Sequence, residues 1–590
     1  MKTKAPKGVK QWKLGFALVL LGGVSALAHG ETPGAVGPVP APAPVIATAP
    51  VPEAVRARPL PIQELTARWV YQLLLAEIAA QRGHLGLATK TYLDLARTTK
   101  DPRVARRATE VALYAHDLPA VQTALTLWLK EDPKSPSARE TLGGLILSQP
   151  NLIDALPILA PLIAVDRSSA GDDFLGLDVV LVQHPDHAHA LSLAQRLTEP
   201  YPDVPEGHYL VSTLAAQDGK IDLALTEIRK ALQLRPDWEM GVALEAQLLQ
   251  KSDPAQAQNL YQSFLAKHPE AREVRLQYAR FLVEQKDYAG GQREFQTLLQ
   301  ADPGQPDLLL AVGLLDMQLK DYPTAEEKFK KVLAGEYRDP DRVRFYLGQA
   351  EEEQHHWEQA IQWYEAISSG EQHPLAQIRV ALILAQQGQT QKALDMLSRM
   401  PAPSSERLEQ RTLAQEQIQR DAGDDQGAFD TLSQALATLP DSTDLLYERA
   451  IVADKLNRFD VLEKDLRRVI ALRPDYAHAY NALGYSMAER NIRLDEAGDL
   501  IRKALSLSPD DPFIIDSLGW VQYREGHFHE SVDTLKRAFA ADPDPEIASH
   551  LGEALWASGD QTEARQIWES TLKDHPDNAA LLATVHRFLH

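Results

Sequence analysis

The sequence contains no cysteine in its 590 residues. This absence excludes disulfide bonds, thiol nucleophiles and zinc sites that are built from thiolates. It also excludes a direct lipid anchor of the bacterial lipoprotein type, because that lipid is carried by a cysteine immediately after the cleaved signal. The fold must therefore be stabilised by side-chain packing, for which a content of 44% hydrophobic residues is sufficient.

Basic residues are outnumbered by acidic ones. The chain has 61 lysines and arginines against 82 aspartates and glutamates, which gives a formal net charge of −21. A protein that binds nucleic acid needs a basic surface to replace the counterions of the phosphates. We therefore expect no nucleic-acid partner, and the acidity gives some preference for basic partner surfaces.

Sequence motifs of catalysis and metal binding are absent as well. The chain has no glycine-rich phosphate loop, nucleophile elbow or HExxH motif. Two groups of histidines are close in sequence, but neither has the spacing at which metal ligands converge. They are His184, His187 and His189, and the adjacent pair His355 and His356. The sequence thus predicts no catalytic residue, no metal site and no cofactor.

What the sequence does contain is a pattern that returns about every 34 residues. Each unit has a segment whose small and apolar residues are four and three positions apart, so that they share one helix face. A proline follows this segment, and since proline cannot continue a helix it marks the helix end. The prolines nearest the C-terminus stand 34, 35, 34 and 33 residues apart: Pro440, Pro474, Pro509, Pro543 and Pro576.

A second helix is predicted upstream of each such segment, marked by an apolar residue followed by glycine. A glycine lets two antiparallel helices approach closely, and a large apolar side chain fills the space beside it. This period with these positions is typical of tetratricopeptide repeat (TPR) units. The sequence therefore predicts an all-α chain, a TPR-type α-solenoid superhelix of about fifteen helical pairs with a C-terminal capping helix. The markers are Val312-Gly313, Leu347-Gly348, Leu483-Gly484, Leu518-Gly519 and Leu551-Gly552.

The N-terminus has the layout of a secretory signal peptide. Several lysines precede an apolar run from Leu14 to Val24, and small residues follow at Ala26 and Ala28. We expect a signal peptide over 1–28 and therefore a periplasmic location. An uncleaved signal that holds the chain at the membrane is the alternative.

The rest of the chain divides by composition into four expected regions. A stretch that alternates proline with small residues favours a disordered, polyproline-like linker. It is followed by degenerate TPR-like repeats, by clearer TPR repeats and by the capping helix. Two stretches, 165–173 and 401–405, are either hinges or ordinary long turns between repeats. The expected boundaries are 29–61 for the linker, 62–203 and 204–576 for the repeats, and 577–590 for the cap.

The predicted binding surface is the concave groove, which is lined by the first helix of each pair. An extended peptide needs flat apolar area and hydrogen-bond partners, so aromatic residues beside polar ones are the best candidates. For Tyr485 and Trp520 the alternative is packing between neighbouring repeats. The candidate residues are Tyr447, Asn481, Tyr485, Asp516, Trp520, Tyr523 and Arg524.

Several segments resemble a family of proteobacterial outer-membrane TPR lipoproteins. These segments are 73–83, 101–108, 479–485, 493–497 and 516–523. The family binds a carboxyl-terminal processing protease and presents murein hydrolases to it. The resemblance implies that an opening helix from Leu65 to Ala80 is a docking element, although its apolar face is equally needed to pack the first repeat. This chain departs from the family because it has no cysteine to carry a lipid.

The predicted function is that of a non-enzymatic adaptor of the bacterial cell envelope, which brings client proteins to a partner such as a periplasmic processing protease. Its expected partners are other proteins or peptides, including the protease and cell-wall hydrolase clients. Membrane association then requires a partner or the uncleaved signal. The alternative is a TPR scaffold for envelope polysaccharide export or for assembly of an outer-membrane complex.

Overall fold

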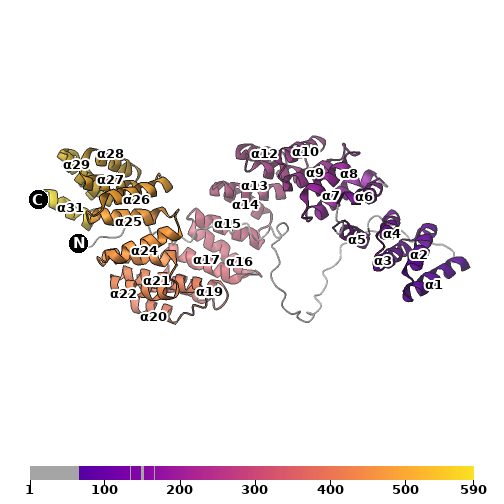
Figure 1. Cartoon of the computed structure of the whole chain (residues 1–590), viewed down its shortest axis with the longest axis horizontal. Helices are drawn as coiled ribbons and strands as arrows, with labels where there is room; N and C mark the ends of the chain where they lie inside the picture. Colours follow the sequence, from indigo (N-terminus) through magenta and orange to yellow (C-terminus); the bar gives the residue numbers. More distant parts are fainter. Residues whose placement is uncertain (1–65, 133–134, 148–151, 165–166, 590) are drawn as a thin grey trace. The chain divides into compact units, whose positions relative to one another are not determined.

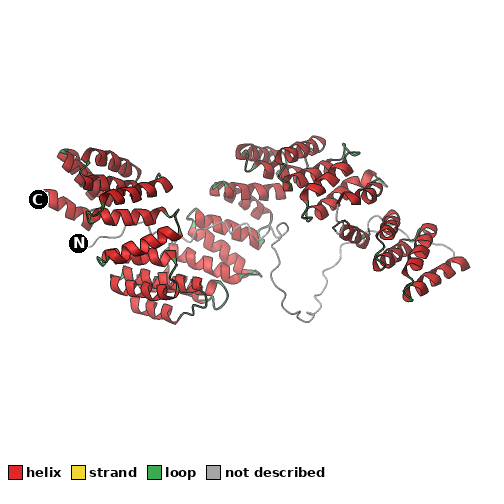
Figure 2. Ribbon diagram, in the orientation of Figure 1, coloured by secondary structure: helices red, strands yellow, loops and turns green. Residues whose placement is uncertain are grey.

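The computed structural model describes residues 66–132, 135–147, 152–164 and 167–589. Over these ranges the chain forms 31 α-helices and no strand, which confirms the all-α solenoid of TPR type (Figures 1 and 2). The expected signal peptide and linker lie outside the described residues. None of the described helices has the length and apolarity needed to cross a lipid bilayer.

The chain separates into two compact units, with the boundary between Leu315 and Asp316 inside helix α15 (Pro306–Gln318). We call them the N-terminal unit and the C-terminal unit and describe each by itself. The N-terminal unit contains α1 (Ala67–Gln81), α2 (Leu85–Thr99), α3 (Pro102–Tyr114), α4 (Leu118–Glu131), α5 (Pro136–Leu147), α6 (Leu156–Ile163), α7 (Ala170–Leu181), α8 (His187–Thr198), α9 (Pro205–Gln217), α10 (Ile221–Leu234), α11 (Glu239–Leu249), α12 (Pro254–Lys267), α13 (Arg272–Glu284) and α14 (Tyr288–Ala301).

The C-terminal unit continues the alternation of helices to the end of the chain. Its last helix stands alone, after complete helical pairs. The helices are α16 (Tyr322–Ala334), α17 (Pro340–Glu353), α18 (Trp357–Glu365), α19 (Gln372–Gln386), α20 (Thr390–Arg399), α21 (Ser405–Asp421), α22 (Asp425–Thr438), α23 (Thr443–Lys455), α24 (Phe459–Leu472), α25 (Ala477–Glu489), α26 (Leu494–Leu507), α27 (Pro512–Glu525), α28 (Phe528–Ala541), α29 (Pro545–Ser558), α30 (Gln561–Asp574) and α31 (Ala579–Leu589).

The glycines of the repeat lie where the two helices of a pair touch. A Cβ atom at Gly348 would come 2.5 Å from Cε1 of Tyr364, and one at Gly552 would come 2.0 Å from Nε1 of Trp568. Both aromatic side chains belong to the second helix of the pair and are buried. Glycine is therefore required because the partner ring occupies the space of its missing side chain.

The second helix of many pairs begins with an aspartate cap. Asp287 accepts a hydrogen bond from the backbone N–H of Gly290 at 2.8 Å, and Asp424 accepts one from Gly427 at the same distance. Such a cap satisfies an amide that has no partner inside the helix. The short turn before the cap contains a left-handed residue, which before Asp424 is Gly423 with φ of 79°.

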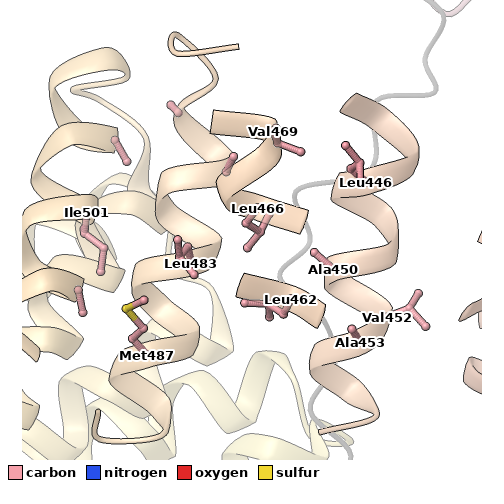
Figure 3. Close-up of a cluster of buried hydrophobic side chains, with 14 of the residues drawn as sticks. Leu446, Ala450, Val452, Ala453, Leu462, Leu466, Val469, Leu483, Met487 and Ile501 are labelled. Carbon is pink, nitrogen blue, oxygen red and sulfur yellow. The ribbon is translucent and has the colours of Figure 1, made fainter. Parts of the chain in front are cut away.

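Buried apolar side chains from successive pairs form the core of each unit. In the C-terminal unit, Leu462 and Leu466 of α24 face Leu483 and Met487 of α25, and Ile501 of α26 continues the cluster (Figure 3). Each pair thus covers the apolar face of the next, as expected for a solenoid. At the C-terminal end, α31 buries Leu581 against the last pair and acts as the capping helix.

Two irregular places coincide with the expected breaks. The segment 165–173 runs from the connection after α6 through a 3-10 turn at Arg167–Ser169 into the first turn of α7, with residues 165–166 outside the description, and α6 has only eight residues with Pro161 inside it. The segment 401–405 connects α20 to the start of α21. Both stretches are therefore connections between helical pairs.

The glycine contacts give a direct test of the packing. We expect Gly552→Ala to lower the free energy of unfolding of the C-terminal unit by about 1–3 kcal/mol, because the new methyl group displaces the buried Trp568 ring. Urea denaturation measures the change. Gly335→Ala is the control in the same unit, because the nearest atom to a Cβ there is the backbone oxygen of Val332 at 3.7 Å, an ordinary contact distance. Equal stability of Gly552→Ala and the parent would contradict the close-packing role.

Candidate protein-binding site

The predicted groove residues lie on the first helices of three successive pairs in the C-terminal unit. Tyr447 lies on α23, and Asn481 and Tyr485 lie on α25. The other four candidates lie on α27: Asp516, Trp520, Tyr523 and Arg524. The structure adds three residues of α29 and α31 that the sequence analysis did not select, namely Glu546, His550 and Arg587.

Trp520 packs between neighbouring repeats and is only 5% exposed. Its indole Nε1 donates a hydrogen bond to Glu489 Oε1 of α25 at 2.6 Å. On its other side the ring stacks on His550 of α29, with centroids 4.1 Å apart and planes inclined by 22°. Of the two alternatives for Trp520, the structure therefore places it in the packed position.

Asp516 is also buried, and it pairs with His550. The imidazole Nδ1 lies 2.9 Å from Asp516 Oδ2 and 3.1 Å from Oδ1. Burial by itself lowers the pKa of this histidine, but the charge and hydrogen bond of Asp516, with Glu546 and Glu489 nearby, outweigh it. The pKa of His550 is raised to about 9, so the pair is an imidazolium and a carboxylate at neutral pH.

Tyr485 is engaged across three repeats. Its hydroxyl group on α25 donates a hydrogen bond to Glu546 Oε1 on α29 at 3.2 Å, so it bridges over α27. Burial raises the pKa of Tyr485 well above its ordinary value, and burial also raises the pKa of Glu546. Tyr485 therefore contributes to packing, the alternative that the sequence left open for it.

The remaining candidates lie at the margin of this cluster or apart from it. Tyr523 is partly exposed and stacks on Trp520 with centroids 4.8 Å apart, and the Arg524 guanidinium carbon lies 5.8 Å from the Trp520 ring centroid. Tyr447 instead packs edge-on against Tyr476, and Asn481 is partly exposed on α25. The structure thus brings five of the seven candidates together.

The residues that were missed follow the repeat period. His550 stands 34 residues after Asp516, and Arg587 stands 34 residues after Glu553, with which it forms an ion pair. Side chains one repeat apart lie on adjacent first helices. Oppositely charged residues 34 positions apart in the sequence therefore indicate pairs of this kind. The contact from Tyr485 to Glu546 has no such signal, because it spans 61 residues and depends on the curvature of the stack.

The arrangement forms a filled inner wall across α25, α27 and α29. Its buried part consists of the Trp520 and His550 rings and the carboxyl groups around them, while Glu489, Tyr523 and Arg524 remain accessible at its edge. Among the described residues, no three histidine or acidic side chains are placed to hold a metal ion. The accessible edge offers a carboxylate, a phenol and a guanidinium, which suit hydrogen bonding to a polypeptide.

A second accessible surface lies on α1, the first helix described. Ala76 and Ala79 face the interior and pack with Tyr92 of α2. Large apolar side chains on the other faces of α1 are exposed: Val70 at 40%, Tyr71 at 66%, Leu73 at 41%, Leu74 at 55% and Ile78 at 46%. The alanines therefore pack the first repeat, while these five larger side chains of α1 remain at least 40% exposed. Leu65, the expected start of this helix, lies outside the described residues.

Comparisons with known proteins agree with the repeat architecture. The chain is 38% identical over 539 residues to a TPR repeat-containing protein of Pseudomonas aeruginosa, covering 91% of this chain and 89% of that protein. Sequence models described as tetratricopeptide repeat match residues 248–315, 310–374, 447–512 and 517–580.

Solved structures that resemble the chain include the APC/C hetero-tetramer Cut9–Hcn1, at 14% identity and a TM-score of 0.31, covering 83% of this chain and 97% of that chain. A thermophilic TPR protein from Thermus thermophilus is similar at 23% identity and a TM-score of 0.29, covering 31% of this chain and 100% of that chain.

The buried His550 pair predicts a pH dependence of stability. Because the folded pKa of about 9 exceeds the ordinary value of 6.5, the stabilising contribution is fully present below pH 6.5 and is lost as the pH rises through about 9. We expect the C-terminal unit to lose at most on the order of 3 kcal/mol across this window. Urea denaturation at pH 6 to 10 measures the change.

His550→Gln removes the titrating group and should remove this part of the pH dependence. His529→Gln on α28 is the matched control, because that histidine is exposed. A parent protein and a His550→Gln variant with parallel stability profiles between pH 6.5 and 9 would show that the pair is not charged as described.

Proposed function

This chain belongs to the tetratricopeptide repeat proteins, and we propose that it is a non-enzymatic adaptor of the bacterial cell envelope that brings client proteins to a periplasmic processing protease. Tetratricopeptide repeats indicate a scaffold for protein–protein interaction, since stacked helical pairs present long surfaces to other chains. The proposed adaptor role is more specific than a general scaffold, because it assigns one surface to the protease and a separate surface to the client.

The observation that carries the proposal is the uncovered apolar surface of α1. Leu74 and Ile78 are four residues apart and so lie on one helix face, and both are about half exposed. An amphipathic helix of this kind binds in an apolar groove of a partner through residues spaced by three and four. We assign α1 to the protease, in line with the resemblance of residues 73–83 to the opening helix of protease-binding adaptors.

The C-terminal unit is the proposed surface for the client. Its accessible edge at Glu489, Tyr523 and Arg524 combines an aromatic ring with charged groups, which are the residue types that contribute most to recognition. The net charge of −21 favours clients with basic surfaces and raises their rate of encounter. The two partners then bind to different units and do not compete for one site.

Export is a further part of the proposal. The lysines, the apolar run and the small residues within 1–28 support secretion to the periplasm. Without a cysteine, attachment to a membrane has to come from the protease partner or from an uncleaved signal. The adaptor therefore works either free in the periplasm or held by its partner.

Substitution on α1 tests the adaptor role. We expect Leu74→Asp with Ile78→Asp, in the full chain, to lower recovery of a processing protease from envelope extract at least tenfold, because charges replace the apolar contacts. Quantitative mass spectrometry of the captured proteins measures the change, and circular dichroism shows whether the helices are retained.

Leu582→Asp is the matched control, because Leu582 is a similarly exposed apolar residue on α31. Capture of a processing protease that is equal for all three proteins would contradict docking through α1. Capture of polysaccharide-export proteins in place of a protease would instead favour the alternative scaffold in envelope glycan export.

A further inference from the structure

Helix α21 lies where two buried apolar clusters of the C-terminal unit meet. One buried cluster extends from α17 to α21 and includes Ala414 and Ile418, while the next begins with Ala428 on α22 and continues to α27. Leu413 of α21 packs at the edge of this second cluster. The connection before α21 contains Pro401 and Pro403 and is not helical. Helix α21 therefore contributes apolar side chains to both clusters and links the repeats before it to those after it.

Glu416 occupies the position where other first helices carry glycine. It stands nine residues before α22 begins at Asp425 (425 − 416), just as Gly519 stands nine residues before α28 begins at Phe528 (528 − 519). The glutamate side chain is nevertheless only 2% exposed. A carboxyl group is thus buried at a place that small residues fill elsewhere.

The carboxyl group of Glu416 shares one cation with a second buried carboxyl group. Arg420 of α21 donates from Nη1 to Glu448 Oε2 of α23 at 3.0 Å. Its Nε lies 3.3 Å from Glu416 Oε1, but that oxygen has no well-aligned hydrogen bond among the described residues. Two carboxyl groups on adjacent first helices therefore compete for one guanidinium.

The charges around this cluster do not neutralise it when both carboxyl groups are ionised. Asp421 of α21 and Asp444 of α23 add negative charge nearby, and Lys455 of α23 adds positive charge. The Nζ atom of Lys455 lies 3.5 Å from Oδ1 of Asp425 on α22, so Lys455 also pairs with a carboxyl group outside this cluster. Asp444 in turn lies 3.4 Å from Nη1 of Arg473. A buried cluster in which carboxyl groups outnumber cations is costly when all of them are ionised, because burial removes the charges from solvent.

We propose that the contact between α21 and α23 is a proton-dependent joint of the C-terminal unit, which holds while one of the two carboxyl groups on Arg420 keeps its proton and loosens when both are ionised. The joint lies between the first helices of two successive pairs, α21–α22 and α23–α24. Loosening of this contact therefore changes the distance and angle between the first helices before the joint and those after it. This inference does not depend on the identity of any partner.

The direction of the response follows from the burial of Glu416. In the closed joint, burial first, and then the charge of Glu448, raise the pKa of Glu416 to about 8, against its ordinary value of 4.5 when exposed. The stabilising contribution of the protonated form is fully present below about pH 4.5 and is lost as the pH rises through about 8. Mild acid thus tightens the joint.

A distance measurement across the joint tests the proposal. Because the chain has no cysteine, Lys392→Cys on α20 and Lys503→Cys on α26 introduce the only two labelling sites for nitroxides. We expect pulsed electron–electron double resonance on the full chain to show a second distance between the two labels, which is populated when the joint loosens. The ratio of this population to the first should rise at most tenfold per pH unit between pH 5 and 8 and level off above.

Glu416→Gln keeps the shape of the protonated carboxyl group and cannot ionise. In this background the distance distribution should keep its pH 5 form at every pH up to 9. Glu406→Gln is the matched control on the exposed first turn of α21 and should respond as the parent does. His550 lies outside the labelled span and does not contribute to the readout.

Glu448→Gln provides an independent variant if Glu416→Gln does not fold. It leaves Glu416 as the single carboxyl group on Arg420, so the pH response should become smaller and move to lower pH. A parent distribution that is unchanged from pH 5 to 9, or a response in Glu416→Gln equal to that of the parent, would overturn the joint.

Discussion

The close approach of the two helices in each pair is the constraint on which the rest of this structure depends. At Gly348 and Gly552 the second helix places the ring of Tyr364 or Trp568 where a side chain would otherwise stand. This contact fixes the separation within a pair, and the separation determines which faces are left for the next pair. The first helices therefore form one wall because their opposite faces are held against the second helices by these glycine contacts.

The sequence predicts this architecture well, because the glycine positions and the helix-ending prolines recur together with one period. It also places the candidate residues on the correct helices. It does not predict which of them remain accessible, because the contact from Tyr485 to Glu546 passes over an intervening repeat and depends on how strongly the stack curves. The pairing of His550 with Asp516 could be predicted from the sequence, because the two residues are one repeat period apart.

The two ends of the repeat array differ in a way that matters for partner binding. At the C-terminal end, α31 buries Leu581 against the last pair. At the start of the described chain, α1 packs with the small residues Ala76 and Ala79 and leaves its larger apolar residues exposed. A terminal helix whose only role is to cap a core has polar residues on its outer face. The exposed apolar side chains of α1 are therefore the basis of the docking surface proposed above for a partner.

The acidity of the chain takes a specific form in the C-terminal unit. Burial raises the pKa of five glutamates, all on first helices; they are Glu351, Glu416, Glu448, Glu546 and Glu553. Glu416 and Glu448 share the guanidinium of Arg420, and Glu553 pairs with Arg587. Where two buried carboxyl groups share one guanidinium, as Glu416 and Glu448 share Arg420, a proton on one of them neutralises the second negative charge. A basic side chain supplied by a partner is the other way, because it brings the missing positive charge to the same carboxyl groups. The proposed joint and the proposed preference for basic clients therefore depend on the same feature, the buried acidic side chains of the first helices.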